Sequence, residues 1–258
     1  MELSLMTYLL VCPLIFLAGF IDSIAGGGGL ISLPAYYLAG LPPALAAGTN
    51  KMGAFMGTAV ATGKYASKGH IPWKMGLWAL LGSLPGSYLG AELLQLLPEY
   101  YVKLGVLIAL PLVALFVLIR KDSLTPKARV PENWSLPACF IIGLVIGLYD
   151  GLVGPGTGTF LQLLFVSLIG MEVLKASGAA RLVNLCSNIG ALISFIISGQ
   201  VLYALALPAA LFGMAGNYLG SSLAIKKGVG LIRLLLIVVL GLLMAALAWD
   251  VLVGHSLF

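Results

Sequence analysis

The chain has 258 residues, of which 60% are hydrophobic and only 9% are charged, whereas about a quarter of the residues in a soluble domain are charged. Apolar segments of the length that crosses a bilayer recur from end to end, and no stretch is long enough to form a soluble domain. The formal charge of +5 comes from fourteen Lys and Arg residues, mostly in short loops, which indicates membrane orientation and not a nucleic-acid surface.

The chain is therefore expected to be an all-α integral membrane protein in a lipid bilayer, with five hydrophobic segments in each half. The N-terminus is interpreted as a retained first helix, because Glu2 stands where a signal peptide carries basic residues. We divide the chain into a first transmembrane repeat at 1–120, a polar linker at 121–135 and a second transmembrane repeat at 136–258. The expected segments are 5–24, 29–40, 44–66, 71–96 and 101–119 in the first repeat, and 136–153, 156–170, 174–197, 201–224 and 229–252 in the second.

The two halves match in residue identity as well as in hydropathy. An offset of 128 residues aligns Asp22 with Asp150 and the glycine-rich stretch that follows each of them. Beyond these stretches the offset becomes 130, which implies two extra residues in the second copy, and Lys51 then aligns with Arg181. The same offset aligns two G-x-Y-L-G motifs, so the match predicts an internal duplication.

The distribution of basic residues predicts that the two copies are inverted. The loop after the third segment is basic only in the first half, and the region after the fourth segment is basic only in the second half. These residues are Lys64, Lys68 and Lys74 in the first half and Lys226, Lys227 and Arg233 in the second. Because basic loops stay in the cytoplasm, we expect a multi-pass protein of the bacterial inner membrane with a cytoplasmic linker and both termini outside. This placement requires an odd net number of membrane crossings in each half. It leaves open whether the segments 29–40 and 156–170 cross fully or are re-entrant, so eight to ten spans are expected.

Glycine clusters at equivalent positions predict broken helices that face a common site. Each glycine inside a helix costs about 1 kcal/mol relative to alanine. Where a helix breaks inside the membrane, its unpaired backbone N–H and C=O groups are tolerated only if they are buried in protein or line a water-filled cavity. In transporters built from inverted repeats, such breaks bind the substrate, because helix N-termini attract anions. Close helix packing or an ordinary turn is the alternative. The residues expected to bind substrate are Gly26, Gly27, Gly28 and Gly29 in the first copy and Gly156, Thr157, Gly158 and Thr159 in the second.

A cation lies about two turns inside the third segment of each half, Lys51 in one and Arg181 in the other. Charge at this depth is costly and usually functional, so we expect the pair to provide countercharge for an anion. The alternative is that Lys51 extends its stem to the interface. The polar partners expected around the anion are Thr49, Asn50, Asn184 and Asn188.

One acid stands beside each break, Asp22 in the first copy and Asp150 in the second. Three roles stay open for them: proton carriers, N-caps of the helix that follows, or ion-pair partners of Lys51 and Arg181. An anion site beside ionised carboxylates requires them to be protonated, paired or turned away.

Other motifs point to packing or are absent. Glycines at four-residue spacing predict tight helix contacts, as at Gly82, Gly86 and Gly90 and at Gly216 and Gly220. The sequence contains no H-E-x-x-H, Walker or G-x-S-x-G motif, so no enzyme activity is expected. Cys12, Cys139 and Cys186 lie in apolar segments without a metal-binding pattern, so neither a metal nor another cofactor is expected.

The duplicated unit resembles the TauE/SafE sulfite exporter family, also called the toluenesulfonate uptake permease family. The likeness is carried by G-F-I-D-S-I-A-G-G-G-G at 19–29, G-T-N-K at 48–51, K-G-H-I at 68–71 and G-L-Y-D-G-L-V-G-P-G-T-G at 147–158. The resemblance implies membrane transporters of small sulfur-containing or carboxylate anions. One departure is that residues 178–181 read G-A-A-R where the first half reads G-T-N-K.

The expected function is a secondary transporter for a small anion, such as sulfite or a sulfonate, with alternating access between the two repeats. Without an ATP-binding element, energy is expected from a gradient of protons, another ion or the substrate. The alternative is a channel whose filter is lined by the backbone of the glycine clusters. The assembly state stays open, with a homodimer among the alternatives.

Overall fold

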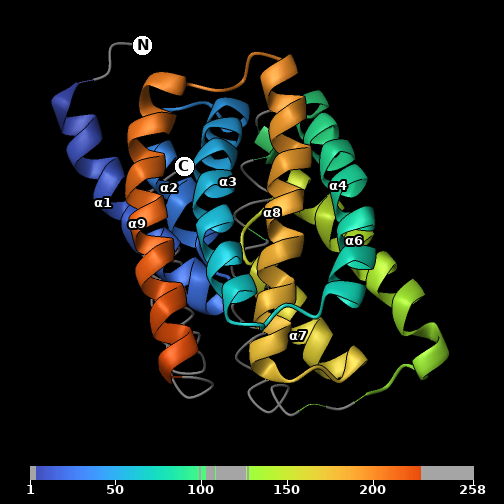
Figure 1. Ribbon diagram of the computed structural model, residues 1–258. Coiled ribbons are helices and arrows are strands. Elements are labelled where there is room, and N and C mark those ends of the chain that lie inside the picture. Colours follow the sequence, from blue (N-terminus) through green and yellow to red (C-terminus); the bar gives the residue numbers. More distant parts are fainter. Residues whose placement is uncertain (1–3, 99, 103–107, 109–125, 127, 228–258) are drawn as a thin grey trace.

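The computed structural model describes residues 4–98, 100–102, 108, 126 and 128–227, which contain helices and no strands. Two groups of four helices correspond to eight of the ten expected segments (Figure 1). The helices of the first half are α1 (Leu5–Ala25), α2 (Gly29–Leu38), α3 (Pro43–Ser67) and α4 (Trp73–Leu96). Those of the second half are α6 (Ser135–Leu152), α7 (Thr157–Leu164), α8 (Val173–Ile197) and α9 (Tyr203–Lys227). The expected segment at 229–252 and nearly all of that at 101–119 lie outside the described residues.

Two short elements complete the second half. The 3₁₀ turn η2 (Glu132–Trp134) leads directly into α6, and the π-helical turn η3 (Phe165–Ile169) continues α7. Among the described helices, three stretches are long and apolar enough to cross a membrane by length and composition: Leu5–Ala25, Glu132–Leu152 and Val173–Ile197. With the sequence composition, they identify the chain as a membrane protein.

The short second helix of each half is not long enough to cross a bilayer alone. The apolar helices Gly29–Leu38 and Thr157–Ile169 fall well below the about 20 residues that a span requires. Helix α2 folds back on α1, because Leu30 near its start packs with Ile21 and Tyr36 near its end belongs to the same buried cluster as Cys12. The expected segment 29–40, for which the sequence left full crossing and re-entry open, is thus a short helix that folds back on α1.

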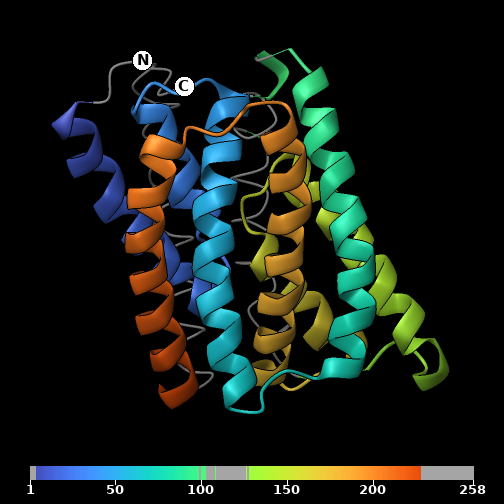
Figure 2. The same ribbon diagram turned by 45° about the horizontal axis from the view of Figure 1, so that its top comes forward.

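The long helices of the two halves pack against each other in exchanged pairs. Helix α1 packs against α9, and α4 packs against α6, while α3 and α8 lie between these pairs and contact each other (Figures 1 and 2). The predicted packing glycines lie at these contacts, because a Cβ on any of them would overlap the backbone of the facing helix. The facing carbonyls belong to Phe140, Leu144 and Leu148 for Gly82, Gly86 and Gly90, and to Phe16 and Phe20 for Gly216 and Gly220.

The long helices run in two directions, and exposed basic residues lie at one end of the bundle. In the view of Figure 1, α1, α3 and α9 run downward, whereas α4, α6 and α8 run upward. Exposed basic side chains gather at the lower end, where α3 and α9 finish and α4 and α8 begin. They are Lys68, Lys74, Arg129, Lys175, Lys226 and Lys227. At the other end, the described connections 39–42, 97–98 and 198–202 carry no Lys or Arg.

Candidate functional site

The two glycine-rich breaks meet in the interior of the bundle. Helix α1 finishes at Ala25, and Gly26 then adopts a φ of +86°, a conformation that glycine reaches without strain. A Cβ on Gly26 would overlap the backbone of Gly158 and Thr159, so no larger residue fits between the two breaks. The Thr159 hydroxyl donates a hydrogen bond of 2.7 Å to the Ala25 carbonyl, which ties the start of α7 to the end of α1.

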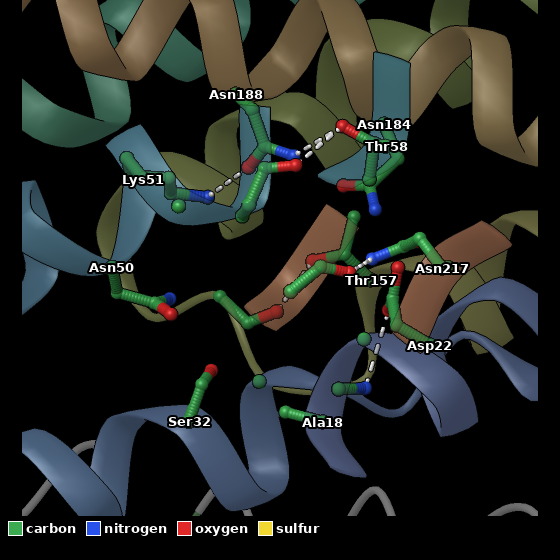
Figure 3. Close-up of a pocket in the computed structure, with 18 of the residues that line it drawn as sticks. Ala18, Asp22, Ser32, Asn50, Lys51, Thr58, Thr157, Asn184, Asn188 and Asn217 are labelled. Atoms are coloured by element: carbon green, nitrogen blue, oxygen red, sulfur yellow. Dashed lines mark hydrogen bonds between the residues drawn. The ribbon is translucent and has the colours of Figure 1, made fainter. Parts of the chain in front are cut away.

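A cavity of about 60 Å³ lies beside this junction, lined by residues of both halves (Figure 3). Polar side chains surround it from several helices and from the helix breaks, with Ala18, Gly53 and Gly213 between them. The lining includes eleven of the residues that the sequence singled out: Asp22, Gly26, Gly28, Gly29, Asn50, Lys51, Asp150, Thr157, Gly158, Asn184 and Asn188. The structure therefore brings together residues from both copies of the duplicated unit.

Lys51 is the cation that lines the cavity, and its amine is already held by protein groups. Its Nζ lies 2.6 Å from Oδ2 of Asp150 and donates a hydrogen bond of 3.3 Å to Oδ1 of Asn188. Asp150 also accepts hydrogen bonds from the hydroxyls of Thr157, at 2.7 Å, and Ser187. Lys51 is only 5% exposed, so it is a buried cation. The alternative that its side chain extends to the membrane interface does not fit this burial.

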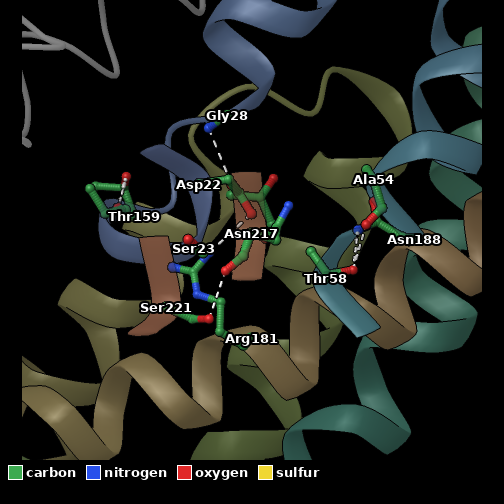
Figure 4. A network of polar contacts seen from close by, with 12 residues as sticks. Asp22, Ser23, Gly28, Ala54, Thr58, Thr159, Arg181, Asn188, Asn217 and Ser221 are labelled. Carbon is green, nitrogen blue, oxygen red and sulfur yellow. Dashed lines mark hydrogen bonds and ion pairs between the residues drawn. The ribbon is translucent and has the colours of Figure 1, made fainter. Parts of the chain in front are cut away.

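The second cation forms the equivalent pair with the other aspartate (Figure 4). Nη1 of Arg181 donates a hydrogen bond of 3.2 Å to Oδ2 of Asp22, and the Arg181 side chain is fully buried. The other carboxylate oxygen of Asp22 accepts a hydrogen bond of 3.2 Å from the backbone N–H of Gly28, directly before α2. Asp22 thus forms the ion pair that the sequence left open among three roles, and its bond to Gly28 reaches the residue before α2 and not an N–H inside that helix. The four charges of the site sum to zero.

The starts of α2 and α7 line the same cavity, and the N–H groups of Gly28 and Thr157 there already donate to Asp22 and to the Gly154 carbonyl. Gly28 and Gly29 at the first break and Thr157 and Gly158 at the second all line it. The first N–H groups of a helix have no acceptor inside the helix and carry partial positive charge. Lys51, these helix starts, the cavity amides and the carboxylates of Asp22 and Asp150 together line one small polar chamber.

Five of the residues expected to bind substrate do not line the cavity: Gly27, Thr49, Gly156, Thr159 and Arg181. The Thr49 hydroxyl accepts a hydrogen bond of 3.0 Å from the Leu202 N–H, so it holds the connection before α9. Thr159 is used in the same way at Ala25, and Gly156, with a φ of +80°, forms the turn into α7. Thr159 and Gly156 thus support the geometry of the breaks, and Thr49 that of the connection before α9.

Sequence reasoning missed three polar side chains of the cavity, namely Ser32, Thr58 and Asn217. The duplication itself contained a signal for Thr58, because the offset of 130 aligns it with the predicted residue Asn188. The two side chains meet, since Nδ2 of Asn188 donates to Oγ1 of Thr58 at 3.4 Å. Asn217 is the variable residue of the second G-x-Y-L-G motif, which sequence reasoning treated as helix packing alone.

Comparison with known proteins gives a consistent family. The family model described as sulfite exporter TauE/SafE matches residues 11–247. A probable membrane transporter protein, ORF9, of a Sinorhizobium species is 41% identical over 228 residues, which cover 87% of this chain and 85% of that protein. The probable membrane transporter protein YfcA of Escherichia coli K12 is 36% identical, over 91% of this chain and 87% of its own length. One from Haemophilus influenzae is 32% identical, over 91% and 92%. No solved structure matches the chain.

Proposed function

The chain belongs to the sulfite exporter TauE/SafE family of membrane proteins, and from this membership we propose that it is a secondary carrier for a small anion. The substrate class we propose is sulfite, a sulfonate or a related sulfur oxyanion, or a small carboxylate. The observation that carries the proposal is the cavity between the two helix breaks, which is lined by the amine of Lys51 and by two helix starts. Such a chamber recognises oxygen atoms that bear negative charge.

The anion competes with Asp150 for Lys51 in this proposal. Lys51 already has a carboxylate partner, so an entering anion gains the full attraction of the amine only if Asp150 releases it. A proton on Asp150 achieves this release, because the neutral acid holds an amine weakly. The hydroxyls of Thr157 and Ser187 then keep the acid in place. This exchange supplies a route for coupling anion movement to protons.

Alternating access between two inverted repeats is the mechanism we propose. The exchange of ion pairs supports it, because Lys51 of the first half contacts Asp150 of the second, and Arg181 of the second half contacts Asp22 of the first. The alignment of the two halves relates Lys51 to Arg181 and Asp150 to Asp22, so it relates one ion pair to the other. That reciprocity is expected when a two-fold relation connects the repeats.

Two further observations support the inverted relation. Thr58 and Asn188 are aligned with each other and also form a hydrogen bond, as expected of residues beside a two-fold axis. Repeat-related helices run in opposite directions, α1 against α6 and α3 against α8 (Figure 1). With the basic end in the cytoplasm, as positive loops favour, the carrier would lie in the bacterial inner membrane with its linker inside.

Anion flux into vesicles that contain the purified protein tests the proposal. A thermal-shift screen with sulfite, sulfonates and small carboxylates first identifies the anion that stabilises the protein most. We expect Lys51→Met to abolish saturable flux of that anion, because the cavity loses its cation. Lys64→Met is the matched control, since Lys64 belongs to the same helix but lies over the Tyr218 ring, outside the cavity lining.

Three results would contradict the carrier proposal. Unchanged flux in a folded Lys51→Met variant would remove Lys51 from the site. If flux is lost, Lys51→Arg, which keeps the charge, separates the loss of the charge from a loss of folding. Single-channel currents would favour a channel instead of a carrier. The absence of any stabilising or transported anion in the screen would refute the substrate class.

A further inference from the structure

Four buried side chains outside the cavity lining have polar atoms without a hydrogen-bond partner within the described residues, Tyr36, Thr62, Gln162 and Arg181, and only in the last two is more than one atom unpaired. Gln162 of α7 is 1% exposed, and neither its Nε2 nor its Oε1 has a hydrogen-bond partner within the described residues. Arg181 of α8 is fully buried, and its Nε and Nη2 are unpaired in the same sense, while Nη1 binds Asp22. Buried polar groups are nearly always paired in native proteins because leaving them unpaired is costly. Their partner is therefore expected from outside the described chain.

The duplication relates these two residues to two that do line the cavity. The offset of 130 aligns Gln162 with Ser32 and Arg181 with Lys51. Ser32 and Lys51 line the cavity, whereas Gln162 and Arg181 do not. The cavity thus reaches one cation of the repeated pair, and the unpaired atoms of Gln162 and Arg181 belong to the equivalent positions that it does not reach.

The two cations also lie at different depths. Lys51 follows the first residue of α3, Pro43, by eight residues, and Arg181 follows the first residue of α8, Val173, by the same number. At 1.5 Å per residue, each cation lies about 12 Å inside a helix about 37 Å long. Because α3 and α8 begin at opposite ends of the bundle (Figure 1), Arg181 lies nearer the basic end and Lys51 nearer the other.

We propose that Gln162 and Arg181 form a second half-site for the anion, which opens toward the basic end when the present cavity closes. This inference rests on the proposed carrier function and assigns Gln162 as a binding residue of the opposite state. The planar guanidinium of Arg181 offers its free Nε and Nη2 to oxyanion oxygens. The Gln162 amide donates to the same oxygens, and Asp22 keeps the guanidinium oriented through Nη1.

Gln162→Leu tests the proposal without removing a charge. Replacing an unpaired buried amide by an apolar side chain of similar size leaves folding unchanged or improves it. Sulfite uptake is measured separately from each face of vesicles with uniform protein orientation. From the basic face we expect the half-saturation concentration to rise about tenfold, as for one or two lost hydrogen bonds to a charged ligand, with a change below about twofold from the other face. Ser32→Ala is the matched control, for which the affected face is reversed.

A labelling experiment decides the point without relying on transport. Gln162→Cys is introduced with Cys12, Cys139 and Cys186, which are buried free thiols, replaced by alanine. A charged thiol reagent is expected to react from the basic face and not from the other. Equal sulfite kinetics of Gln162→Leu and the native chain from both faces, or no labelling from the basic face, would overturn the half-site. If the native chain moves no sulfite, the carrier proposal fails for that anion, while the labelling still decides whether the half-site opens.

Discussion

At the scale of single residues, the site is an arrangement of two ion pairs whose formal charges cancel. Each carboxylate pairs with a buried cation from the other half of the chain, with Lys51 2.6 Å from Asp150 and Arg181 3.2 Å from Asp22. Removing one member of a buried pair leaves an uncompensated charge and costs about 3–5 kcal/mol. The two pairs therefore join the halves and hold both cations in place.

This charge balance predicts that Asp150→Asn becomes dependent on an anion for stability. Lys51 loses its counterion in this variant, so we expect a loss of about 3–5 kcal/mol without ligand. A bound anion then replaces the missing carboxylate, and the ligand-induced rise in melting temperature should exceed that of the native chain. Thermal unfolding with and without sulfite measures both effects. Glu92→Gln is the control, because Glu92 accepts a hydrogen bond from Ser194 outside the cavity lining. A smaller anion-induced rise in Asp150→Asn than in the native chain would disprove the exchange at Lys51.

The residue types of the site could be predicted, but their partners could not. A carboxylate beside a helix break is equally compatible with capping, pairing and proton transfer, and only the fold decides which groups come within 4 Å. Asp22 and Asp150 accept hydrogen bonds from the Gly28 N–H and the Thr157 hydroxyl in addition to pairing with a cation. Thr49 shows the limit of the approach, because the next two residues line the cavity while its own hydroxyl accepts a hydrogen bond from the Leu202 N–H.

At the scale of helices, close backbone contacts connect the two halves. Along α4 and α6 the glycines of one helix face backbone carbonyls of the other, and the same holds for α1 and α9. In a membrane, helix association depends on such packing because lipid is as apolar as the side chains. The four-residue glycine spacing was sufficient to predict these contacts, although it did not reveal which helix lies opposite.

Gly86→Ala is therefore expected to destabilise the protein, although alanine is the better helix former. The added Cβ would overlap the carbonyl oxygen of Leu144, and relieving such overpacking costs about 1–3 kcal/mol. Gly63→Ala is the matched control, because Gly63 also lies inside a long helix and has nothing within 4 Å of the added atom. That variant should be unchanged or more stable by up to about 1 kcal/mol. Melting temperatures in detergent compare the two, and equal melting temperatures would refute the contact.

The short helix of the second half ends differently from its counterpart in the first half. Thr157–Ile169 is longer than Gly29–Leu38 and has a π-helical turn at its end. The Leu168 carbonyl in this turn accepts hydrogen bonds from the N–H groups of Arg129 and Val130. The linker is thereby attached to the end of the short helix. A π-turn has no sequence pattern of its own, so its place could not be predicted.

At the scale of the whole molecule, hydropathy was enough to place eight helices, because each apolar segment must form all its backbone hydrogen bonds within itself. Hydropathy could not predict that α1 packs against α9 of the other half and that α6 packs against α4. A hydrophobic segment carries no information about its neighbour when every surface is apolar. The small residues at the helix contacts and the four charged residues at the centre determine which helices lie side by side. Their interactions form only when the helices pack.

The opposite placement of equivalent loops is the prediction that tests the whole arrangement. Ser67 ends α3 and Ser198 follows α8, both exposed and at nearly equivalent points of the two copies, yet they lie at opposite ends of the bundle (Figure 1). In a background with the three native cysteines replaced by alanine, Ser67→Cys should react with a membrane-impermeant thiol reagent only from the cytoplasm, and Ser198→Cys only from outside. The sides follow from Lys64 and Lys68 near the first position and from the absence of Lys or Arg at 198–202. Labelling of both positions from one side would exclude inverted repeats and, with them, alternating access by exchange of the two half-sites. Labelling from opposite sides in the reverse sense would keep the repeats but turn the molecule over, so that Gln162 and Arg181 would bind the anion from the outside.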